Sequence, residues 1–416
     1  MHKPAQDAVM TPRAAWLLIL AAAAILMITM GARLTTGLFM SPINTATGLG
    51  IASISFAMAI GQFVWGAAQP VFGAVADKWG SSRVIIVGAL LLAGGTALTP
   101  FVDSQWGLIL CMGILSAAGA GAGSFSILIG ATAQRLPPER RPFAAGFINA
   151  GGSFGQFVFA PVMQAIISSA GWVMAMLTMA ATTLLTIPLA WPLRRGAGVA
   201  KTDAPKPAPA PGIGLGAQIR IALRDRNYLL LHAGFFTCGF HIAFLVTHLP
   251  GEVALCNLSP EVSATALALI GLFNIAGSLS AGALSTRYRM KSLLALMYAS
   301  RAVMIALYLV APKTAMTFYV FAAALGFTWL ATVPPTAGLI GKLFGVRYLS
   351  TLFGLTLLSH QTGGFFGAWL GGLSFVTYGD YTWMWYADIV LALAAALLNL
   401  PIREAHVVRA PAVAGA

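Results

Sequence analysis

The feature that most constrains this chain is a succession of long apolar runs separated by short loops rich in Lys and Arg. Only 8% of the residues are charged, whereas soluble proteins carry about 25%. A transmembrane helix needs roughly 20 apolar residues to cross a bilayer, and a transmembrane β-barrel shows alternation instead of such runs. The sequence therefore predicts an all-α membrane protein with twelve transmembrane helices, over 14–40, 51–73, 83–101, 105–134, 143–168, 171–193, 228–249, 261–285, 292–311, 316–341, 350–376 and 381–401.

The basic residues predict how these helices are oriented. With the N-terminus in the cytoplasm, all 24 Lys and Arg residues except Arg33, Arg301 and Lys313 fall in cytoplasmic segments. Cytoplasmic loops carry such an excess of Lys and Arg, so we expect a multi-pass protein of the inner (plasma) membrane with both termini in the cytoplasm. The net charge of +13 then belongs to loops beside the lipid bilayer. We expect a monomer in the bilayer and no nucleic-acid partner.

A polar segment divides the chain into two halves. It covers 194–227, and its centre at 201–212 alternates Pro with Ala, a pattern that favours an extended linker. The predicted domains are an N-terminal six-helix bundle at 1–193, a cytoplasmic linker at 194–227 and a C-terminal six-helix bundle at 228–416.

The two halves also resemble each other weakly. At an offset of about 208 residues, 73–78 falls near 282–287 and 147–155 falls on 355–363. Repeated six-helix halves fit a transporter whose substrate site lies at the interface between the repeats.

The loop between the second and third predicted helices carries a family motif. It reads GAVADKWGSSR at 73–83 and resembles the signature loop of the major facilitator superfamily. That resemblance implies the major facilitator fold, with twelve helices in two six-helix bundles. It also implies a cytoplasmic gate in which charged residues latch the halves together in the outward-open state. The corresponding residues here are Gly73, Asp77, Lys78, Gly80 and Arg83.

A narrower resemblance is to the bacterial members of the monocarboxylate-transporter-like branch. It is carried by the residues at 33–42, 151–156, 239–241, 247–250 and 359–361. The resemblance implies small monocarboxylates as substrates. Studied members of this branch bear an Asp and an Arg on the eighth helix, where this chain offers Asn274 and Ser278.

Ionisable residues at membrane depth are functional candidates because they are costly to insert. Arg33 lies about 12 Å inside the outer end of the first predicted helix, and its guanidinium matches a carboxylate. Snorkelling to the outer interface is the alternative. His241 and His360 lie about 20 Å and 16 Å from the cytoplasmic ends of their helices. Either could carry a proton together with an anion, or could simply join two helices by a hydrogen bond.

Uncharged polar residues add weaker candidates. Asn149, Ser153 and Gln156 form one stripe on the fifth predicted helix, which either binds substrate or joins helices, the second role being favoured for Ser153. The complete set of predicted substrate-binding residues is Arg33, Gln62, Asn149, Gln156, His241, Asn274, Trp329, His360 and Gln361. Arg301 and Asp388, on the ninth and twelfth helices, predict a structural ion pair.

Several classes of chemistry lack their signatures. Cys111, Cys238 and Cys256 have no metal-ligand spacing, and the sequence shows no nucleotide-binding loop, so we expect neither metal nor cofactor. A membrane enzyme would need a nucleophile or an acid–base pair near an interface, and the sequence offers none. A receptor on the same fold would be told apart by a transport measurement.

The predicted cavity groups are basic, and the one intramembrane acid, Asp388, belongs to a peripheral helix. The sequence therefore predicts a secondary active transporter for a small organic anion, driven by proton symport or by exchange. The alternative is an exporter of amphiphilic or drug-like compounds, which the richness in Met, Phe and Gly also allows.

Overall fold

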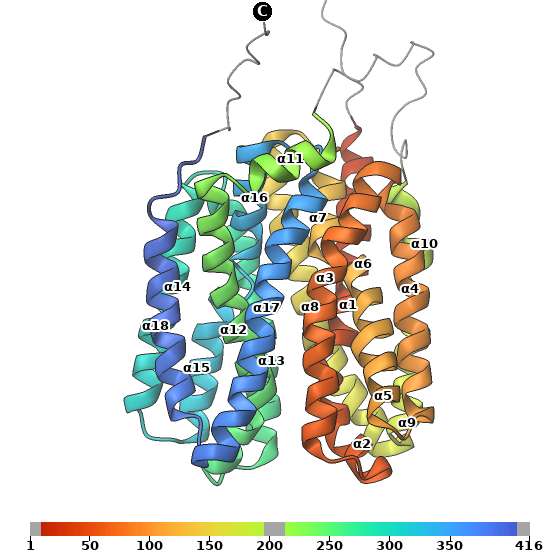
Figure 1. Cartoon of the computed structure of the whole chain (residues 1–416), viewed down its shortest axis with the longest axis vertical. Coiled ribbons are helices and arrows are strands. Elements are labelled where there is room, and N and C mark those ends of the chain that lie inside the picture. Colours follow the sequence, from red (N-terminus) through yellow and green to blue (C-terminus); the bar gives the residue numbers. More distant parts are fainter. Residues whose placement is uncertain (1–9, 195–212, 406–416) are drawn as a thin grey trace, which may run out of the picture.

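The computed structural model describes residues 10–194 and 213–405, almost all of them in helices that run side by side (Figure 1). In the first half, the helices are α1 (Pro12–Leu34), η1 (Thr36–Phe39), α2 (Met40–Thr47), α3 (Ile51–Trp79), α4 (Ser81–Leu98), η2 (Thr99–Phe101), α5 (Gln105–Leu108), the π-helix η3 (Ile109–Ser116), α6 (Ala117–Ala122), α7 (Phe125–Ala133), η4 (Pro138–Arg140), α8 (Arg141–Ala170), α9 (Trp172–Thr183), α10 (Thr186–Leu189) and η5 (Trp191–Leu193). In the second half, they are α11 (Leu215–Ala222), α12 (Arg226–Leu255), α13 (Pro260–Leu284), α14 (Met290–Val310), α15 (Ala315–Thr328), α16 (Val333–Phe344), α17 (Leu349–Tyr378) and α18 (Thr382–Asn399).

The twelve predicted spans are all present in the described part of the chain. Ten helical stretches are long and apolar enough to cross a membrane, and α3 and α17 are the other two spans. The largest differences from the predicted ends are at α3, which continues to Trp79, and at α12, which continues to Leu255. The sequence also missed α11, because that short helix lies inside the predicted linker. The Pro-Ala stretch at 201–212 falls outside the described residues.

Two of the spans are interrupted within their length. The fourth is built from α5, η3, α6 and α7, with Gly123 and Ser124 between the last two. The tenth breaks between α15 and α16, and prolines occupy the first turn of α16. Proline suits the first turn of a helix but disrupts its interior. Each break leaves backbone groups that need partners inside the membrane.

The helices form two bundles, with α1 to α10 on one side and α12 to α18 on the other (Figure 1). They touch through α3 against α17 and through α8 against α13. Small residues allow this approach: a Cβ atom on Gly73 would lie 2.7 Å from the Ser350 carbonyl oxygen, and one on Gly146 would lie 2.9 Å from the Gly282 Cα. The contacts are close because there is no side chain between the helices.

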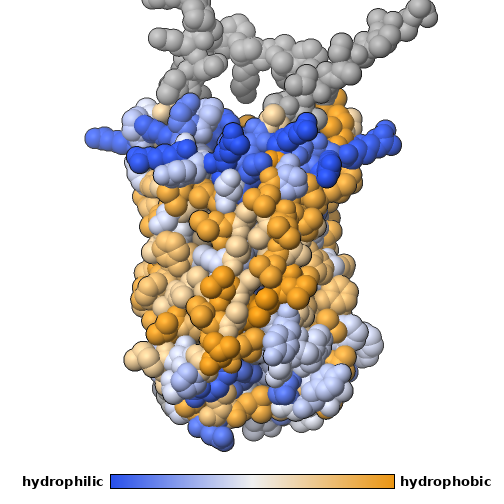
Figure 2. Space-filling model, turned by 90° about the vertical axis from the view of Figure 1, so that its left-hand side faces the viewer, coloured by the Kyte–Doolittle hydropathy of each residue, from blue (hydrophilic) through white to orange (hydrophobic). Residues whose placement is uncertain are grey.

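The two ends of the molecule differ in polarity. A hydrophilic band lies at the end that carries α11, and apolar side chains cover the middle of the molecule (Figure 2). The start of α1 and the end of α18 lie at this same end (Figure 1). We call it the basic face, after basic residues in its loops and at the helix ends beside them: Lys78, Arg83, Arg135, Arg140, Arg141, Arg220, Arg224, Arg287, Arg289, Lys342 and Arg347. The opposite end is called the open face.

Candidate functional site

A cavity of about 2010 Å³ lies between the two bundles. Its lining begins with Ser168, Leu255 and Val376, near the open-face ends of α8, α12 and α17. It continues inward to Phe125 and Leu357. The cavity is therefore reached from the open face.

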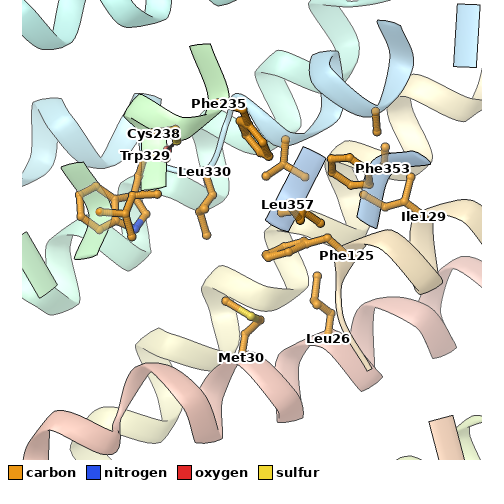
Figure 3. Packing of buried hydrophobic residues seen from close by; sticks show 14 of the residues in the cluster. Leu26, Met30, Phe125, Ile129, Phe235, Cys238, Trp329, Leu330, Phe353 and Leu357 are labelled. Atoms are coloured by element: carbon orange, nitrogen blue, oxygen red, sulfur yellow. Dashed lines mark hydrogen bonds between the residues drawn. The ribbon is translucent and has the colours of Figure 1, made fainter. Parts of the chain in front are cut away.

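Apolar side chains from both bundles close the inner end of the cavity. Figure 3 shows the residues that meet there: Leu26, Met30, Phe125 and Ile129 from the first bundle, and Phe235, Leu330, Phe353 and Leu357 from the second. These side chains are buried and form an apolar layer between the cavity and the basic face. The structure is thus closed at the basic face and accessible at the open face.

The charged residue of the cavity wall is Arg33, near the end of α1. Its Nη2 donates a 2.6 Å hydrogen bond to Oε1 of Gln62 on α3, and the guanidinium lies 4.7 Å from the centre of the Trp65 ring. The side chain is half-buried and lines the cavity. Because a guanidinium has five N–H donors, further donors are available to an anion in the cavity.

His360 and Gln361 of α17 line the facing wall. Nε2 of Gln361 lies 2.8 Å from Nδ1 of His360. An amide nitrogen only donates, so Nδ1 of His360 accepts and the ring proton of the neutral imidazole lies on Nε2. That Nε2 atom has no hydrogen-bond partner among the residues described. It is buried in this conformation, although the His360 side chain as a whole lines the cavity.

The polar residues of the two walls come together where α3 meets α17. A Cβ atom on Gly66 would lie 2.5 Å from the Gln361 Cβ, so α3 and α17 touch at this level. Gln62, which binds Arg33, is one helical turn from Gly66 on α3. Arg33, Gln62, Gln361 and His360 therefore form one polar band between the bundles.

The charge of the cavity wall has one sign. Arg33 is the only described lining residue with a permanent charge, and neither Asp nor Glu occurs among the described residues of the lining. His248 also lines the cavity, with its Nε2 2.7 Å from the Ala368 carbonyl oxygen. The sequence prediction missed His248 as a site residue, although it follows His241 by two helical turns. Such a wall favours an anion over a cation.

The structure divides the predicted substrate residues into two groups. Six of them line the cavity: Arg33, Gln62, Gln156, Trp329, His360 and Gln361. Whether they bind substrate stays a prediction. Asn149, His241 and Asn274 are buried and lie outside the lining, so the expectation that they face the cavity is wrong for this conformation.

Asn149 and Asn274 support the break between α15 and α16. Asn149 donates 2.7 Å hydrogen bonds to Ser278 Oγ and to the Leu330 carbonyl oxygen. Asn274 donates to Ser153 Oγ at 2.5 Å and accepts from the Leu330 N–H at 3.0 Å. The two amides thereby satisfy the backbone that the break exposes. Because these bonds also join α8 to α13, Ser153 does act between helices as predicted.

The predicted ion pair between Arg301 and Asp388 is not formed among the described residues. Oδ2 of Asp388 is instead bound to Nδ1 of His241. Arg301 donates to the carbonyl oxygens of Thr328 and Trp329. These carbonyls end α15, where the helix dipole is negative, and the guanidinium satisfies both of them. Helix assignment alone could not reveal that α15 stops at this depth.

Asp77 connects the bundles at the basic face. Its Oδ2 accepts from the backbone N–H of Thr351 at 2.9 Å and from Thr351 Oγ at 2.7 Å, both at the start of α17. Gln134 Nε2 donates to Oδ1 at 3.0 Å. Asp77 therefore holds the N-terminus of α17, where a helix favours negative charge.

The other predicted gating residues take different positions. Gly73 packs against Ser350, and Gly80 adopts a φ of 102° between α3 and α4, a conformation that glycine permits. Lys78 lies over the Trp79 ring, 4.4 Å from its centre, and Arg83 is exposed. In the described chain, neither base makes a hydrogen bond or ion pair with the second bundle, so only the acid fits the implied latch.

Comparisons with known proteins agree with this architecture. The family model described as Major Facilitator Superfamily matches residues 17–368. Monocarboxylate transporter 13 of Rattus norvegicus is 27% identical over 93% of this chain and 89% of that protein. The oxalate:formate antiporter of Oxalobacter formigenes is 23% identical over 93% of this chain and 91% of its own. Among solved structures, the proton:xylose symporter XylE superposes with a TM-score of 0.71 at 13% identity, covering 93% of this chain and 94% of that one.

Proposed function

Because the chain belongs to the major facilitator superfamily, we propose that it is a secondary active transporter for small organic anions of the monocarboxylate type. The observation that carries this proposal is the sign of the cavity wall. Arg33 lines it together with the side chain of His360, and its described residues include no carboxylate. Two relatives are named for substrates of the same chemical class, one for monocarboxylates and one for oxalate and formate.

The orientation follows from the basic face. We place this face in the cytoplasm, since Lys and Arg concentrate in cytoplasmic loops. The protein then lies in the inner (plasma) membrane with both termini in the cytoplasm, and the cavity opens outward. The domains in this proposal are 1–193 and 228–416, joined by a cytoplasmic linker at 194–227.

The transport cycle in this proposal is alternating access. An anion enters from the open face and binds between Arg33 of one bundle and His360 of the other. A group that contacts both bundles draws them together at that level. The contacts at the basic face, including those of Asp77 with Thr351, must then separate before the anion leaves on the cytoplasmic side. The apolar layer at the inner end of the cavity prevents the cavity from being open to both sides of the membrane at the same time.

To accumulate an anion against its gradient, a secondary active transporter must couple its movement to that of a second ion. A proton that travels with the anion neutralises the moving charge, and exchange for another anion does the same. Both mechanisms are consistent with a single permanent positive charge at the cavity wall.

Counterflow into proteoliposomes tests the function directly. The purified protein is given labelled L-lactate, formate, oxalate and an organic cation, each between pH 5.5 and 8. We expect uptake of the carboxylates and none of the cation. Arg33→Gln and His360→Gln should each raise the KM for the anion, by about tenfold for the loss of one charged hydrogen bond. Arg140→Gln removes the same charge from an exposed position on the basic face and should leave the KM unchanged.

The alternative of an amphiphile exporter has one observation in its favour. The cavity is large, and most of the residues that line it are apolar. Transport of an amphiphilic cation in the same panel, with no response to Arg33→Gln, would establish that alternative and refute the anion proposal.

A further inference from the structure

Behind the cavity wall, the second bundle contains a cluster of buried ionisable groups. His241 of α12, Asp388 of α18 and Arg301 of α14 are each at most 1% exposed. Trp329, in the break between α15 and α16, separates this cluster from the cavity and lines the cavity itself. Nε2 of His241, Oδ1 of Asp388 and Nε of Arg301 lack hydrogen-bond partners among the described residues. Buried polar atoms without partners are uncommon in proteins, and each calls for an explanation.

Resting on the proposed function, we propose that the pair His241–Asp388 is the binding site for the proton that is transported with the anion. The helices that carry the pair are the seventh and twelfth spans. The site therefore lies beside the anion cavity and outside it.

The geometry of the pair defines where the proton binds. Nδ1 of His241 is bound to Oδ2 of Asp388, so with an ionised carboxylate Nδ1 carries the hydrogen and Nε2 holds a lone pair. A proton taken from the medium in the cavity adds to this Nε2, and the imidazole becomes an imidazolium. No other bond breaks. The carboxylate stays ionised and stabilises the new charge through the existing hydrogen bond.

Trp329 connects the proton site to the cavity. The rings of His241 and Trp329 lie with their centres 5.6 Å apart at an interplanar angle of 63°. At this distance the indole lies directly beside the charge that protonation of His241 would create. Because Trp329 lies in the cavity wall, the charge state of His241 affects the surface that the anion meets.

The charges of the cluster couple the proton to the anion. Before protonation, Arg301 and Asp388 cancel each other inside the bundle. The added proton leaves one net positive charge in a low-dielectric region, which is unfavourable without a counter-charge. A carboxylate in the adjacent cavity supplies it. By linkage, each ligand then raises the affinity for the other by the same factor, about 5- to 150-fold in known couplings.

Other titratable groups surround the pair. From α12, the Cys238 thiol contacts Arg301 Nη1 at 3.2 Å and also interacts with His360 of α17. From α14, Tyr298 lies with its ring centre 5.3 Å from the Arg301 guanidinium carbon.

Further toward the open face, the cluster is bordered by another pair. There, Tyr308 of α14 donates a 2.7 Å hydrogen bond to Glu252 of α12, so both already have a partner. His248 of α12 lies 2.7 Å from the Ala368 carbonyl oxygen.

His360 is less suited to carry the proton than His241. Its Nδ1 accepts a hydrogen bond from the Gln361 amide. Protonation of this Nδ1 would break that bond, because the ring N–H and the amide N–H would then face each other as two donors. His241 has its Nε2 lone pair available and an acid on the other ring nitrogen. The two histidines thus have different roles, since His360 contacts the anion and His241 binds the proton.

The test measures protons and anions in the same vesicles. Proteoliposomes containing the full-length protein and internal pyranine receive an inward gradient of labelled L-lactate, and in a second series of oxalate. We expect wild-type protein to acidify the lumen in proportion to anion uptake. Asp388→Asn and His241→Gln should keep anion exchange but lose the proton uptake and the accumulation driven by a pH gradient. His232→Gln is the matched control, because this α12 histidine binds Ser359 at 2.7 Å outside the cluster, and it should retain coupling.

The double variant H241Q/D388N guards against a folding defect, because two amides can keep the hydrogen bond without a titratable charge. If either single variant is not monodisperse, the double variant is measured instead, with the same expected result. Proton uptake that persists in the neutral variants overturns the inference. Anion uptake by wild type without any proton movement also overturns it but leaves the proposed function intact. No anion uptake by wild type refutes the proposed function itself.

Discussion

Replacing Asp77 by Asn should shift the protein away from the conformation seen here. The carboxylate of Asp77 accepts two hydrogen bonds from Thr351, at 2.9 and 2.7 Å, and these join the first bundle to the start of α17. They exist only while the basic face is closed. Weakening them therefore raises the free energy of the conformation that is closed at the basic face, without touching the cavity.

The size of the shift follows from the bonds. A hydrogen bond to a charged group contributes about 1.5–3 kcal/mol. An Asn carbonyl oxygen still accepts, so Asp77→Asn loses roughly half of each bond as well as the favourable charge at a helix N-terminus, about 2 kcal/mol in total. That corresponds to about 30-fold in the ratio of protein closed at the basic face to protein open there. A population ratio of about 99:1 would become about 3:1.

Spin labels can read this ratio directly. Ser168→Cys on α8 and Val376→Cys on α17 place labels on the two bundles at the mouth of the cavity. Cys256, the half-buried one of the native cysteines, is replaced by Ser. Double electron–electron resonance should show a single long distance between the two labels in the protein that carries only these three changes. After Asp77→Asn, a second population with a shorter distance between the labels should appear.

Two further measurements make the prediction refutable. Thr351→Val removes one of the two bonds and should give a smaller shift, while Glu139→Gln makes the same acid-to-amide change at an exposed position and should give none. Substrate affinity should change less than about twofold, because most of the protein remains closed at the basic face. An unchanged distance distribution, or an affinity loss as large as the loss of cycling rate, would contradict the interpretation of Asp77 as a latch.

Three other substitutions have defined outcomes. Gly73→Ala would bring a methyl group within 2.7 Å of the Ser350 carbonyl oxygen. It should therefore weaken closure of the basic face, as read by the same distance measurement. Gly94→Ala, which has open space around it, is the control and should be neutral. Arg301→Gln removes the cation that donates to the two carbonyl oxygens at the break. The loss of two hydrogen bonds from a charged group should lower the free energy of unfolding by about 3–6 kcal/mol, measured by thermal melting; an unchanged melting temperature would show that the break needs no such partner. Arg33→Lys keeps the charge but loses the planar fork, so the KM for carboxylates should rise while selectivity against cations persists; transport of cations by this variant would refute the charge argument.

Much of the fold could be predicted from the chain because the bilayer imposes the length and polarity of each span. The family membership inferred from the loop at 73–83 is confirmed by the match over 17–368. Helix ends were less predictable: α3 and α12 run six residues past their predicted ends. A helix can continue beyond the lipid wherever its backbone finds partners, and hydropathy does not report that.

The site was only partly predictable from the residues. Depth in the membrane, which follows from sequence position, correctly brought Arg33, Gln62 and His360 to the cavity wall. Depth does not fix the direction in which a side chain points around its helix. Asn149 was therefore expected in the cavity but lies in a helix seam, bound to Leu330.

The pairing of charged residues was decided by tertiary structure alone. Arg301 and Asp388 are the residues of opposite sign at membrane depth, so pairing them was reasonable from the sequence. In the fold, the break after Thr328 offers carbonyl oxygens to Arg301, and His241 offers a ring nitrogen to Asp388. These partners come from helices far apart in the chain.

The sequence by itself determined the membrane class, the number of spans and the family, because each depends on composition and periodicity along the chain. The tertiary structure decided which polar groups face the cavity, which support the broken helix, and which carry the closed basic face. Those choices depend on the rotation and contact of helices from different parts of the chain. A one-dimensional pattern does not contain that information.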